Sequence, residues 1–173
     1  MGAHEPVAAD QATAVLDLYD RALPEVHGYL LSRCRDSQVA EDLTGDTFLA
    51  AVAAVRKGTV PDLTVAWLIA VARNKLVDHW RRLEREERKL RLVHQESDDV
   101  TDEWDVHIDA AVAHGVLHRL GAHHRSALTL RYLDGLPVPE VADALGRTLH
   151  ATEALLVRAR SAFRRAYEDG GAT

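Results

Sequence analysis

The sequence predicts an all-α protein made of two helical domains, and three observations support this fold class. Of the 173 residues, 47% are hydrophobic and only 5% are aromatic, a composition typical of packed helices. Apolar residues recur at spacings of three and four along most of the chain. A stretch near the middle lacks this periodicity and is acidic, which predicts a flexible linker. We therefore place domains at residues 11–93 and 107–168, with the linker at residues 94–106.

The first domain is predicted to contain three helices, preceded by a frayed tail at residues 1–10. The first helix covers about residues 11–34, with a kink expected at Pro24 because proline lacks a backbone donor. The second helix begins at a cap formed by Asp36 or Ser37 and ends before Gly58 and Pro61. The third covers about residues 64–92 and changes from an apolar face, which includes Trp67 and Trp80, to a basic one.

The second domain is predicted to contain four helices. We expect them at about residues 107–120, 123–133, 137–145 and 148–167. The last helix has a stripe at alternating spacings of three and four, which predicts a buried face: Leu149, Thr152, Leu156, Ala159, Phe163 and Ala166.

Charge is segregated along the chain, although the net charge of −6 alone argues against a nucleic-acid partner. Residues 73–91 hold eight basic and four acidic side chains, and residues 147–165 hold five basic and one acidic, so each segment carries +4. Between them, residues 96–109 hold seven carboxylates and no Lys or Arg. Two basic modules joined by an acidic connector are typical of a protein that contacts nucleic-acid phosphates at two separate sites. Solvated helix faces would give similar runs, and Glu84, Glu86 and Glu87 can pair with neighbouring cations.

A helix-turn-helix is predicted at residues 139–156, PEVADALG followed by RTLHATEALL. Ala142 is small where two helices cross, Gly146 suits a left-handed turn, and Thr148 can cap the second helix. In such motifs the N-terminal residues of the second helix face the major groove. The exposed residues here are expected to be Arg147, His150, Ala151, Glu153 and Ala154.

Three runs resemble the extracytoplasmic-function sigma factors of the sigma-70 family. Residues 125–136, RSALTLRYLDGL, resemble the helix that leads into the helix-turn-helix of sigma domain 4. Residues 40–49, AEDLTGDTFL, and residues 67–82, WLIAVARNKLVDHWRR, resemble two helices of sigma domain 2. The resemblance covers roughly residues 12–168.

The resemblance implies a sigma factor that binds core RNA polymerase through its β′ and β subunits and directs promoter recognition. The implied polymerase-binding residues are Glu41, Asp42, Asp46 and Phe48. The implied minus-ten DNA-binding residues are Lys57, Arg73, Asn74, Asp78, His79, Arg81 and Arg82. The implied minus-thirty-five DNA-binding residues are Arg147, Thr148, His150, Thr152, Glu153, Arg158 and Arg160. It also implies control by an anti-sigma factor.

The chain departs from the family pattern at two places. Residues 57–63 lack the aromatic and Arg-Gly usual in this loop, so its base preference does not carry over. Glu153 and Leu155 stand where family members commonly have Lys or Arg. We therefore expect weaker or differently specific contact with the minus-thirty-five element.

Other readings remain open. A stand-alone helix-turn-helix regulator would also bind DNA, and a purely structural helical module would bind neither DNA nor polymerase. His114 and His118, at i and i+4, could share a zinc ion, but no His-Glu-x-x-His pattern is present. The lone Cys34 is interpreted as a half-buried core residue, with a redox role as the alternative.

The sequence contains no recognisable catalytic, nucleotide-binding or targeting motif. The sequence contains no P-loop, dinucleotide-binding turn or nucleophile elbow, so we expect no catalysis and no cofactor. It also has no long apolar run and no basic n-region followed by an apolar stretch, so we expect a cytoplasmic protein without membrane insertion.

Overall fold

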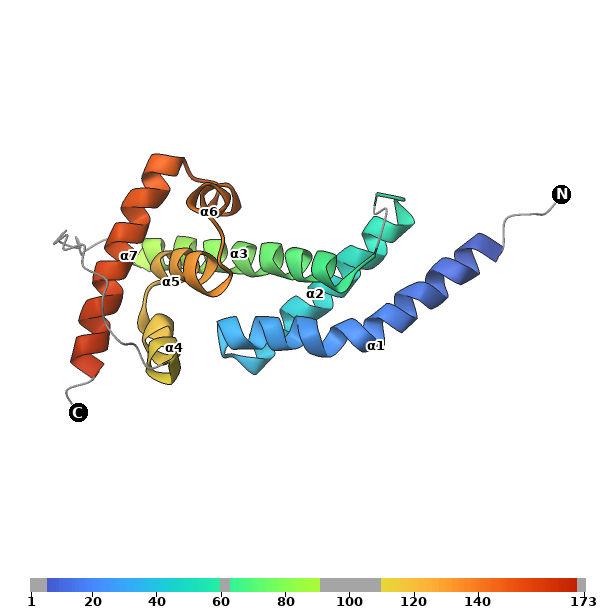
Figure 1. Ribbon diagram of the computed structural model, residues 1–173, viewed down its shortest axis with the longest axis horizontal. Coiled ribbons are helices and arrows are strands. Elements are labelled where there is room, and N and C mark those ends of the chain that lie inside the picture. Colours follow the sequence, from blue (N-terminus) through green and yellow to red (C-terminus); the bar gives the residue numbers. More distant parts are fainter. Residues whose placement is uncertain (1–5, 60–62, 91–109, 171–173) are drawn as a thin grey trace. The chain divides into compact units, whose positions relative to one another are not determined.

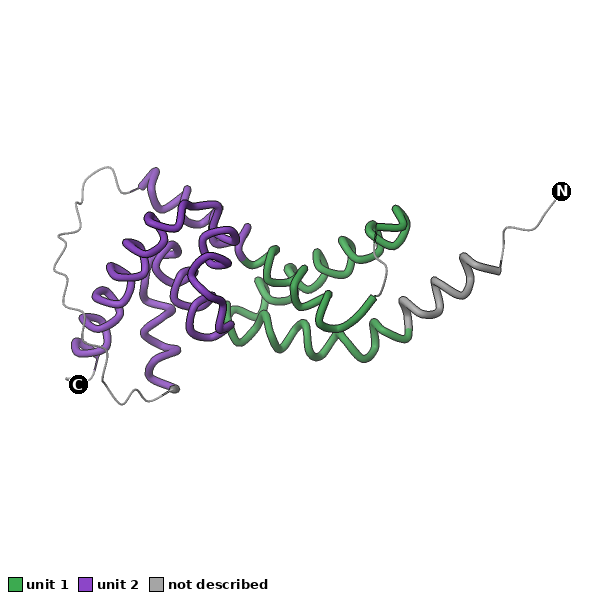
Figure 2. The backbone as a smooth tube through the Cα atoms, turned by 45° about the horizontal axis from the view of Figure 1, so that its top comes forward, with its two compact units in different colours: residues 1–76 green, residues 77–173 purple. Residues whose placement is uncertain are grey.

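The computed structural model describes residues 6–59, 63–90 and 110–170, with side chains from residue 17 onward. Within these ranges it contains seven α-helices and one π-helical turn and no strand, which confirms the all-α prediction (Figure 1). The chain divides into two compact units, residues 1–76 and 77–173, which Figure 2 colours separately. The boundary lies inside helix α3 (Val65–Leu90). The predicted linker lies outside the described residues.

The first unit is built on the packing of α1 (Pro6–Cys34) against α2 (Ser37–Arg56). Pro24 lies inside α1, which continues through it. The turn between the helices is short because Arg35 adopts a left-handed conformation at φ 51°. The Asp36 side chain then caps α2 by accepting a hydrogen bond from the Val39 backbone N–H at 3.0 Å. The predicted cap and start of α2 are therefore confirmed.

The buried face of α2 includes two threonines. Thr44 and Thr47 are 5% and 0% exposed, and their hydroxyls donate to the carbonyl oxygens of Ala40 and Leu43 at 2.6 and 2.7 Å. A buried hydroxyl is costly only when it lacks a partner. These in-helix bonds therefore let threonine serve as a core residue at the helical spacing of Leu43, Thr47 and Ala51.

Both ends of the loop between α2 and α3 are determined by local chemistry. Gly58 has φ 64°, a left-handed conformation that glycine adopts without steric cost, and α2 ends two residues before it. The Thr64 hydroxyl accepts a hydrogen bond from the Trp67 N–H at 3.1 Å and so caps α3. The predicted stop at Gly58 and the predicted start near Thr64 are confirmed, whereas Pro61 lies outside the described residues.

Helix α3 has an apolar face in its first four turns and a charged surface beyond them. Its buried residues at spacings of three and four are Leu68, Ala72, Leu76, Val77 and Trp80. Trp80 is 2% exposed, as expected of a core residue, whereas Trp67 is half-buried.

The second unit surrounds its last helix. It contains α4 (Ala110–Arg119), α5 (Ala122–Leu128), α6 (Val138–Leu145) and α7 (Leu149–Gly170), and α7 packs against the other three. A core cluster joins α4, α5 and α7: Val116, Leu117, Leu128, Ala159 and Phe163. At the far end of α7, Arg119 Nη2 donates to the Ala166 carbonyl oxygen at 2.7 Å. The four predicted helices are present.

The predicted helix at residues 123–133 changes its hydrogen-bonding pattern partway. After α5 the chain forms a π-helical turn, η1 (Thr129–Leu133), in which the Asp134 N–H donates to the Thr129 carbonyl oxygen at 3.0 Å. Thr129 and Leu130 remain buried, and Gly135 at φ 69° then redirects the chain toward α6. We expected a regular α-helix here, because side-chain periodicity does not distinguish an i+5 bond from an i+4 bond over one turn.

Among the described helices, none is both long and apolar enough to cross a lipid bilayer.

Candidate nucleic-acid and polymerase interfaces

Helices α6 and α7 form a helix-turn-helix. Gly146 ends α6 in the left-handed conformation (φ 62°, ψ 40°), and the following Arg147 N–H donates to the Ala142 carbonyl oxygen at 2.9 Å, as in a glycine-terminated helix. Val141, Ala142 and Leu145 are buried. The Thr148 hydroxyl accepts a hydrogen bond from the Ala151 N–H at 3.2 Å. The predicted left-handed turn at Gly146, the close helix crossing at Ala142 and the cap at Thr148 are confirmed, whereas Ala151 and Ala154, predicted to be exposed, are half-buried.

The exposure of side chains at the start of α7, the second helix of the helix-turn-helix, differs in part from the prediction. Thr148, His150, Glu153 and Arg158 are exposed, and Arg147 and Arg160 are half-buried. All six can therefore take part in an interface at the N-terminal half of α7.

Two predictions on α7 need correction. Thr152 is 0% exposed and its hydroxyl donates to the Thr148 carbonyl oxygen at 2.9 Å, so it supports the helix from inside and we remove it from the DNA-contacting set. Leu149, predicted to be buried, is 47% exposed, whereas Leu155 is 1% exposed. Leu149 is the first residue of α7. No earlier turn of this helix covers its side chain.

Polar side chains line the middle of α3. Asn74, Asp78 and Arg82 are exposed, and Arg73, His79 and Arg81 are half-buried. Arg81 Nη1 donates to Asp78 Oδ1 at 3.3 Å, and Arg82 Nη2 lies 3.2 Å from His79 Nδ1. These contacts join residues three apart, which are neighbours on a helix surface. Lys57, at the end of α2, is exposed. Four of the predicted residues on α3 are therefore joined in two neighbouring polar pairs, Asp78 with Arg81 and His79 with Arg82.

The acidic residues predicted on α2 face solvent, and the predicted aromatic residue packs on α1. Glu41, Asp42 and Asp46 are exposed. The rings of Phe48 and Tyr19 have centroids 4.7 Å apart and are tilted by 60°, and Tyr19 is 40% exposed. Phe48 is thus half-buried against α1 and still reaches the surface. Tyr19 was missing from the prediction because its partner lies on another helix.

The alternative of a metal site gains no support. Among the residues whose structure is described, no group of three His, Cys, Asp or Glu side chains is arranged to hold a metal ion. His114 and His118 lie on α4 and are half-buried. Cys34 is half-buried, as predicted, and its thiol donates to the Leu30 carbonyl oxygen at 2.9 Å.

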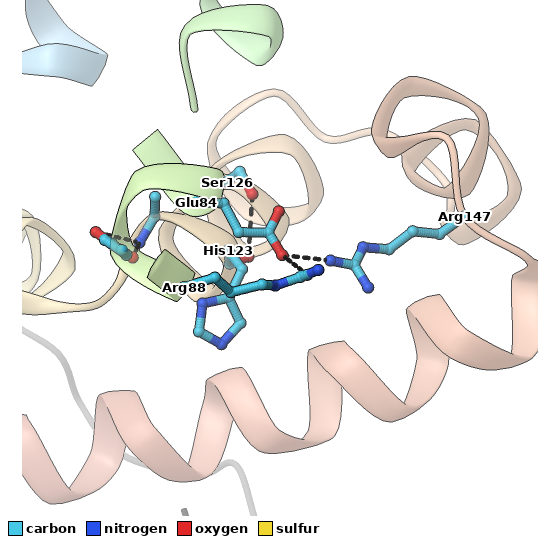
Figure 3. Close-up of polar contacts among 7 residues, drawn as sticks. Glu84, Arg88, His123, Ser126 and Arg147 are labelled. Atoms are coloured by element: carbon cyan, nitrogen blue, oxygen red, sulfur yellow. Dashed lines mark hydrogen bonds and ion pairs between the residues drawn. The ribbon is translucent and has the colours of Figure 1, made fainter. Parts of the chain in front are cut away.

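Three polar contacts in the second unit join the C-terminal half of α3 to residues outside this helix, and a fourth lies within it. Arg147 Nη2 donates to Glu84 Oε1 at 2.7 Å, and Arg88 binds the same oxygen (Figure 3). Arg81 Nη2 donates to the Ala144 carbonyl oxygen, and the Glu87 carboxylate accepts from the Ala122 N–H at 3.1 Å.

Sequence reasoning predicted only the local part of this network. Of the three carboxylates expected to pair with neighbouring cations, Glu84 does so with Arg88, four residues away. The partners of Arg81, Glu84 and Glu87 outside α3 are 35 to 63 residues away, and no spacing rule connects such positions.

Comparison with known proteins supports the assignment of both regions. Residues 18–86 match the family Sigma-70 region 2, and residues 113–163 match Sigma-70, region 4. The chain is similar to the ECF RNA polymerase sigma factor BldN of Streptomyces coelicolor, with 31% identity over 90% of this chain, and spans 61% of that protein's length.

A second relative is covered more fully. The chain is 30% identical to the ECF RNA polymerase sigma factor SigK of Mycolicibacterium vanbaalenii, over 83% of this chain and 76% of that one. The fold is similar to that of the sigma factor RpoE of Bartonella quintana, solved in complex with the anti-sigma factor NepR, with a TM-score of 0.52, 23% identity and coverage of 87% and 94%. The two matched regions occur in the family's order, and the SigK relative is 30% identical over most of both chains. The chain therefore belongs to the ECF RNA polymerase sigma factors of the sigma-70 family.

Proposed function

We propose that this sigma factor binds core RNA polymerase, brings it to promoters and supports the first step of strand opening. The observation that carries the proposal is the presence of region 2 and region 4 in one chain, with a well-formed helix-turn-helix in the second. A stand-alone DNA-binding regulator would need only the helix-turn-helix. The acidic surface of α2 would then have no role.

The polymerase-binding surface that we propose lies on α2. Its members are Glu41, Asp42, Asp46 and Phe48, three exposed carboxylates and one half-buried ring. Exposed carboxylates accelerate the approach to a basic partner, and an aromatic side chain supplies area that loses little conformational entropy on binding. The predicted partner is the coiled coil of the β′ subunit, with region 4 contacting the β subunit.

The minus-ten surface that we propose lies on α3 and the end of α2. Its members are Lys57, Arg73, Asn74, Asp78, His79, Arg81 and Arg82. The cations can neutralise phosphates of a melted strand. The exposed Asn74 amide offers both a donor and two acceptor sites to a flipped base.

The minus-thirty-five surface that we propose lies at the start of α7. Its members are Arg147, Thr148, His150, Glu153, Arg158 and Arg160. Arg147 and Arg158 supply phosphate or guanine contacts, whereas the Glu153 carboxylate can accept a hydrogen bond only from a donor such as the cytosine amino group. Arg160 Nη1 lies 3.4 Å from Tyr132 Oη, which orients its guanidinium at the edge of this surface.

Several other properties follow from this assignment. The chain itself would carry out no catalysis, because the polymerase performs the chemistry, and it would act in the cytoplasm, where polymerase and DNA are found. The Bartonella sigma factor was solved with an anti-sigma factor. We propose a partner of this kind for the present chain as well.

The proposal is tested by mixing the purified chain with core RNA polymerase and selecting promoters from genomic DNA. Co-elution and defined start sites are expected. DNA binding without co-elution, in the presence of active core enzyme, would favour the stand-alone regulator. Binding to neither DNA nor polymerase would favour a structural module.

A further inference from the structure

The C-terminal half of α3 presents three charged residues to the helices of the second unit. Arg81, Glu84 and Glu87 are spaced by three, so they lie on successive turns along one side of the helix. All three belong to the same compact unit as α4 to α7 (Figure 2). We call these three residues the α3 clasp.

Each residue of the α3 clasp meets a group of the opposite charge or polarity. Arg81 donates to the Ala144 carbonyl oxygen in the last turn of α6, where carbonyls lack helical partners and cations are favoured. Glu87 accepts from the Ala122 N–H at the start of α5. The cap residue there, Gly121, has no side chain with which to do so. The α3 clasp thus completes two helix ends that local sequence leaves unpaired.

The central contact of the α3 clasp engages the helix-turn-helix directly. Glu84 Oε1 accepts a hydrogen bond from Arg147 Nη2 at 2.7 Å (Figure 3). The two side chains are 17% and 27% exposed, whereas Arg88, which binds the same oxygen, is 70% exposed. Because partly buried ion pairs are screened less by salt than exposed ones, salt should weaken the Arg147 contact less than the Arg88 contact.

Arg147 is also the residue that immediately follows the turn of the helix-turn-helix. A guanidinium binds a carboxylate and a phosphate with the same planar arrangement of donors. It cannot make both contacts with the same N–H group. The Glu84 carboxylate occupies an N–H group of Arg147 Nη2, so a promoter phosphate or guanine that approaches this side of the guanidinium would compete with Glu84.

We propose that the α3 clasp is autoinhibitory, because Glu84 binds Arg147 where DNA would otherwise bind it. Region 4 must therefore separate from the α3 clasp before it binds a promoter. The inference rests on the proposed function in one respect, the assignment of Arg147 to DNA. Because DNA binds only the open state, the clasp lowers the apparent affinity by the fraction of molecules that are open.

The first test compares Glu84→Ala with Glu86→Ala. Glu86 lies on the same helix and is exposed, so both variants remove one carboxylate, and alanine preserves the helix. The probe is a short fluorescent DNA duplex of random sequence, followed by anisotropy at low salt. We expect Glu84→Ala to bind about three- to tenfold more tightly than Glu86→Ala, the range expected for one charge-assisted hydrogen bond that is partly exposed to solvent.

The Arg147→Ala background separates the clasp from general charge effects. There we expect Glu84→Ala and Glu86→Ala to bind the duplex equally. Equal binding by the two variants in the presence of Arg147 would overturn the proposal, as would failure of every variant to bind the duplex. A persisting difference in the Arg147→Ala background would show that Glu84 acts through another residue and would overturn it too.

The contact itself is tested without DNA or polymerase. A double-mutant cycle of Glu84→Ala and Arg147→Ala, read from urea unfolding, should show coupling of about threefold or more in the unfolding equilibrium constant. Additive effects would contradict the clasp. The co-elution experiment on core polymerase does not depend on Glu84, so failure of the proposed function and failure of the clasp give different results.

Discussion

The guanidinium of Arg81 lies against Gly146, with Nη2 only 3.1 Å from the position that a β-carbon on this glycine would occupy. Gly146 is therefore required for two reasons. Its left-handed backbone, at φ 62°, disfavours residues that carry a β-carbon, and a side chain there would approach Arg81.

Replacing Gly146 with alanine tests the turn of the helix-turn-helix. We expect the free energy of unfolding to fall by about 1–2 kcal/mol, the cost of one left-handed residue, because the tip of Arg81 can move aside. The measurement is urea unfolding followed by circular dichroism. Gly115→Ala is the control, since Gly115 lies inside α4 with open space around it. Alanine there should raise the free energy of unfolding by about 0.5–1 kcal/mol. A loss at Gly115 or no loss at Gly146 would contradict this account.

Replacing Asp42 with asparagine tests the polymerase-binding surface. Removal of an exposed carboxylate should slow association with core polymerase, and the effect should shrink as salt is raised, because steering by rim charges is screened. Association rates from surface plasmon resonance provide the measurement. Asp20→Asn removes another exposed carboxylate, on α1, and should leave the rate unchanged. A similar loss in both variants would indicate only a general effect of net charge.

Replacing Asn74 with alanine tests the minus-ten surface. Because Asn74 is exposed on α3, the substitution should leave folding and polymerase binding intact. Promoter opening should fall roughly tenfold, the loss expected when a hydrogen-bonded base contact worth about 1–3 kcal/mol is removed. Permanganate reactivity of unpaired thymines reports opening, and co-elution reports polymerase binding. A variant that loses polymerase binding instead would place Asn74 in the docking surface.

Replacing Thr152 with valine tests the correction made on α7. Valine has nearly the shape of threonine, and the hydroxyl that it removes bonds only within the helix, to the Thr148 carbonyl oxygen. We expect unchanged affinity for the selected promoter and a stability change below about 1 kcal/mol. His150→Ala, at an exposed position, should weaken binding to the same promoter. Weaker binding by Thr152→Val at unchanged stability would return Thr152 to the DNA-contacting set.

Local chemistry made much of the fold predictable. Asp36, Gly58, Gly146 and Thr148 act on backbone groups within three or four residues, so their roles follow from residue type and position. The buried residues of α2 and α3 follow from the spacing of three and four in the same way. The same periodicity predicted correctly that Thr152 is buried and wrongly that Leu149 is. The expectation that Thr152 contacts DNA came from the family resemblance, and the burial of its side chain contradicts it.

The sequence by itself determined the all-α class, the helix-turn-helix and the resemblance to two sigma regions, because these depend on periods and caps that act within one or two turns. Only the tertiary structure decided that Tyr19 packs on Phe48, that α5 continues into a π-helical turn, and that Arg81, Glu84 and Glu87 reach α5, α6 and Arg147. These contacts join side chains whose separation along the chain is arbitrary. Their distances are set by how the helices pack.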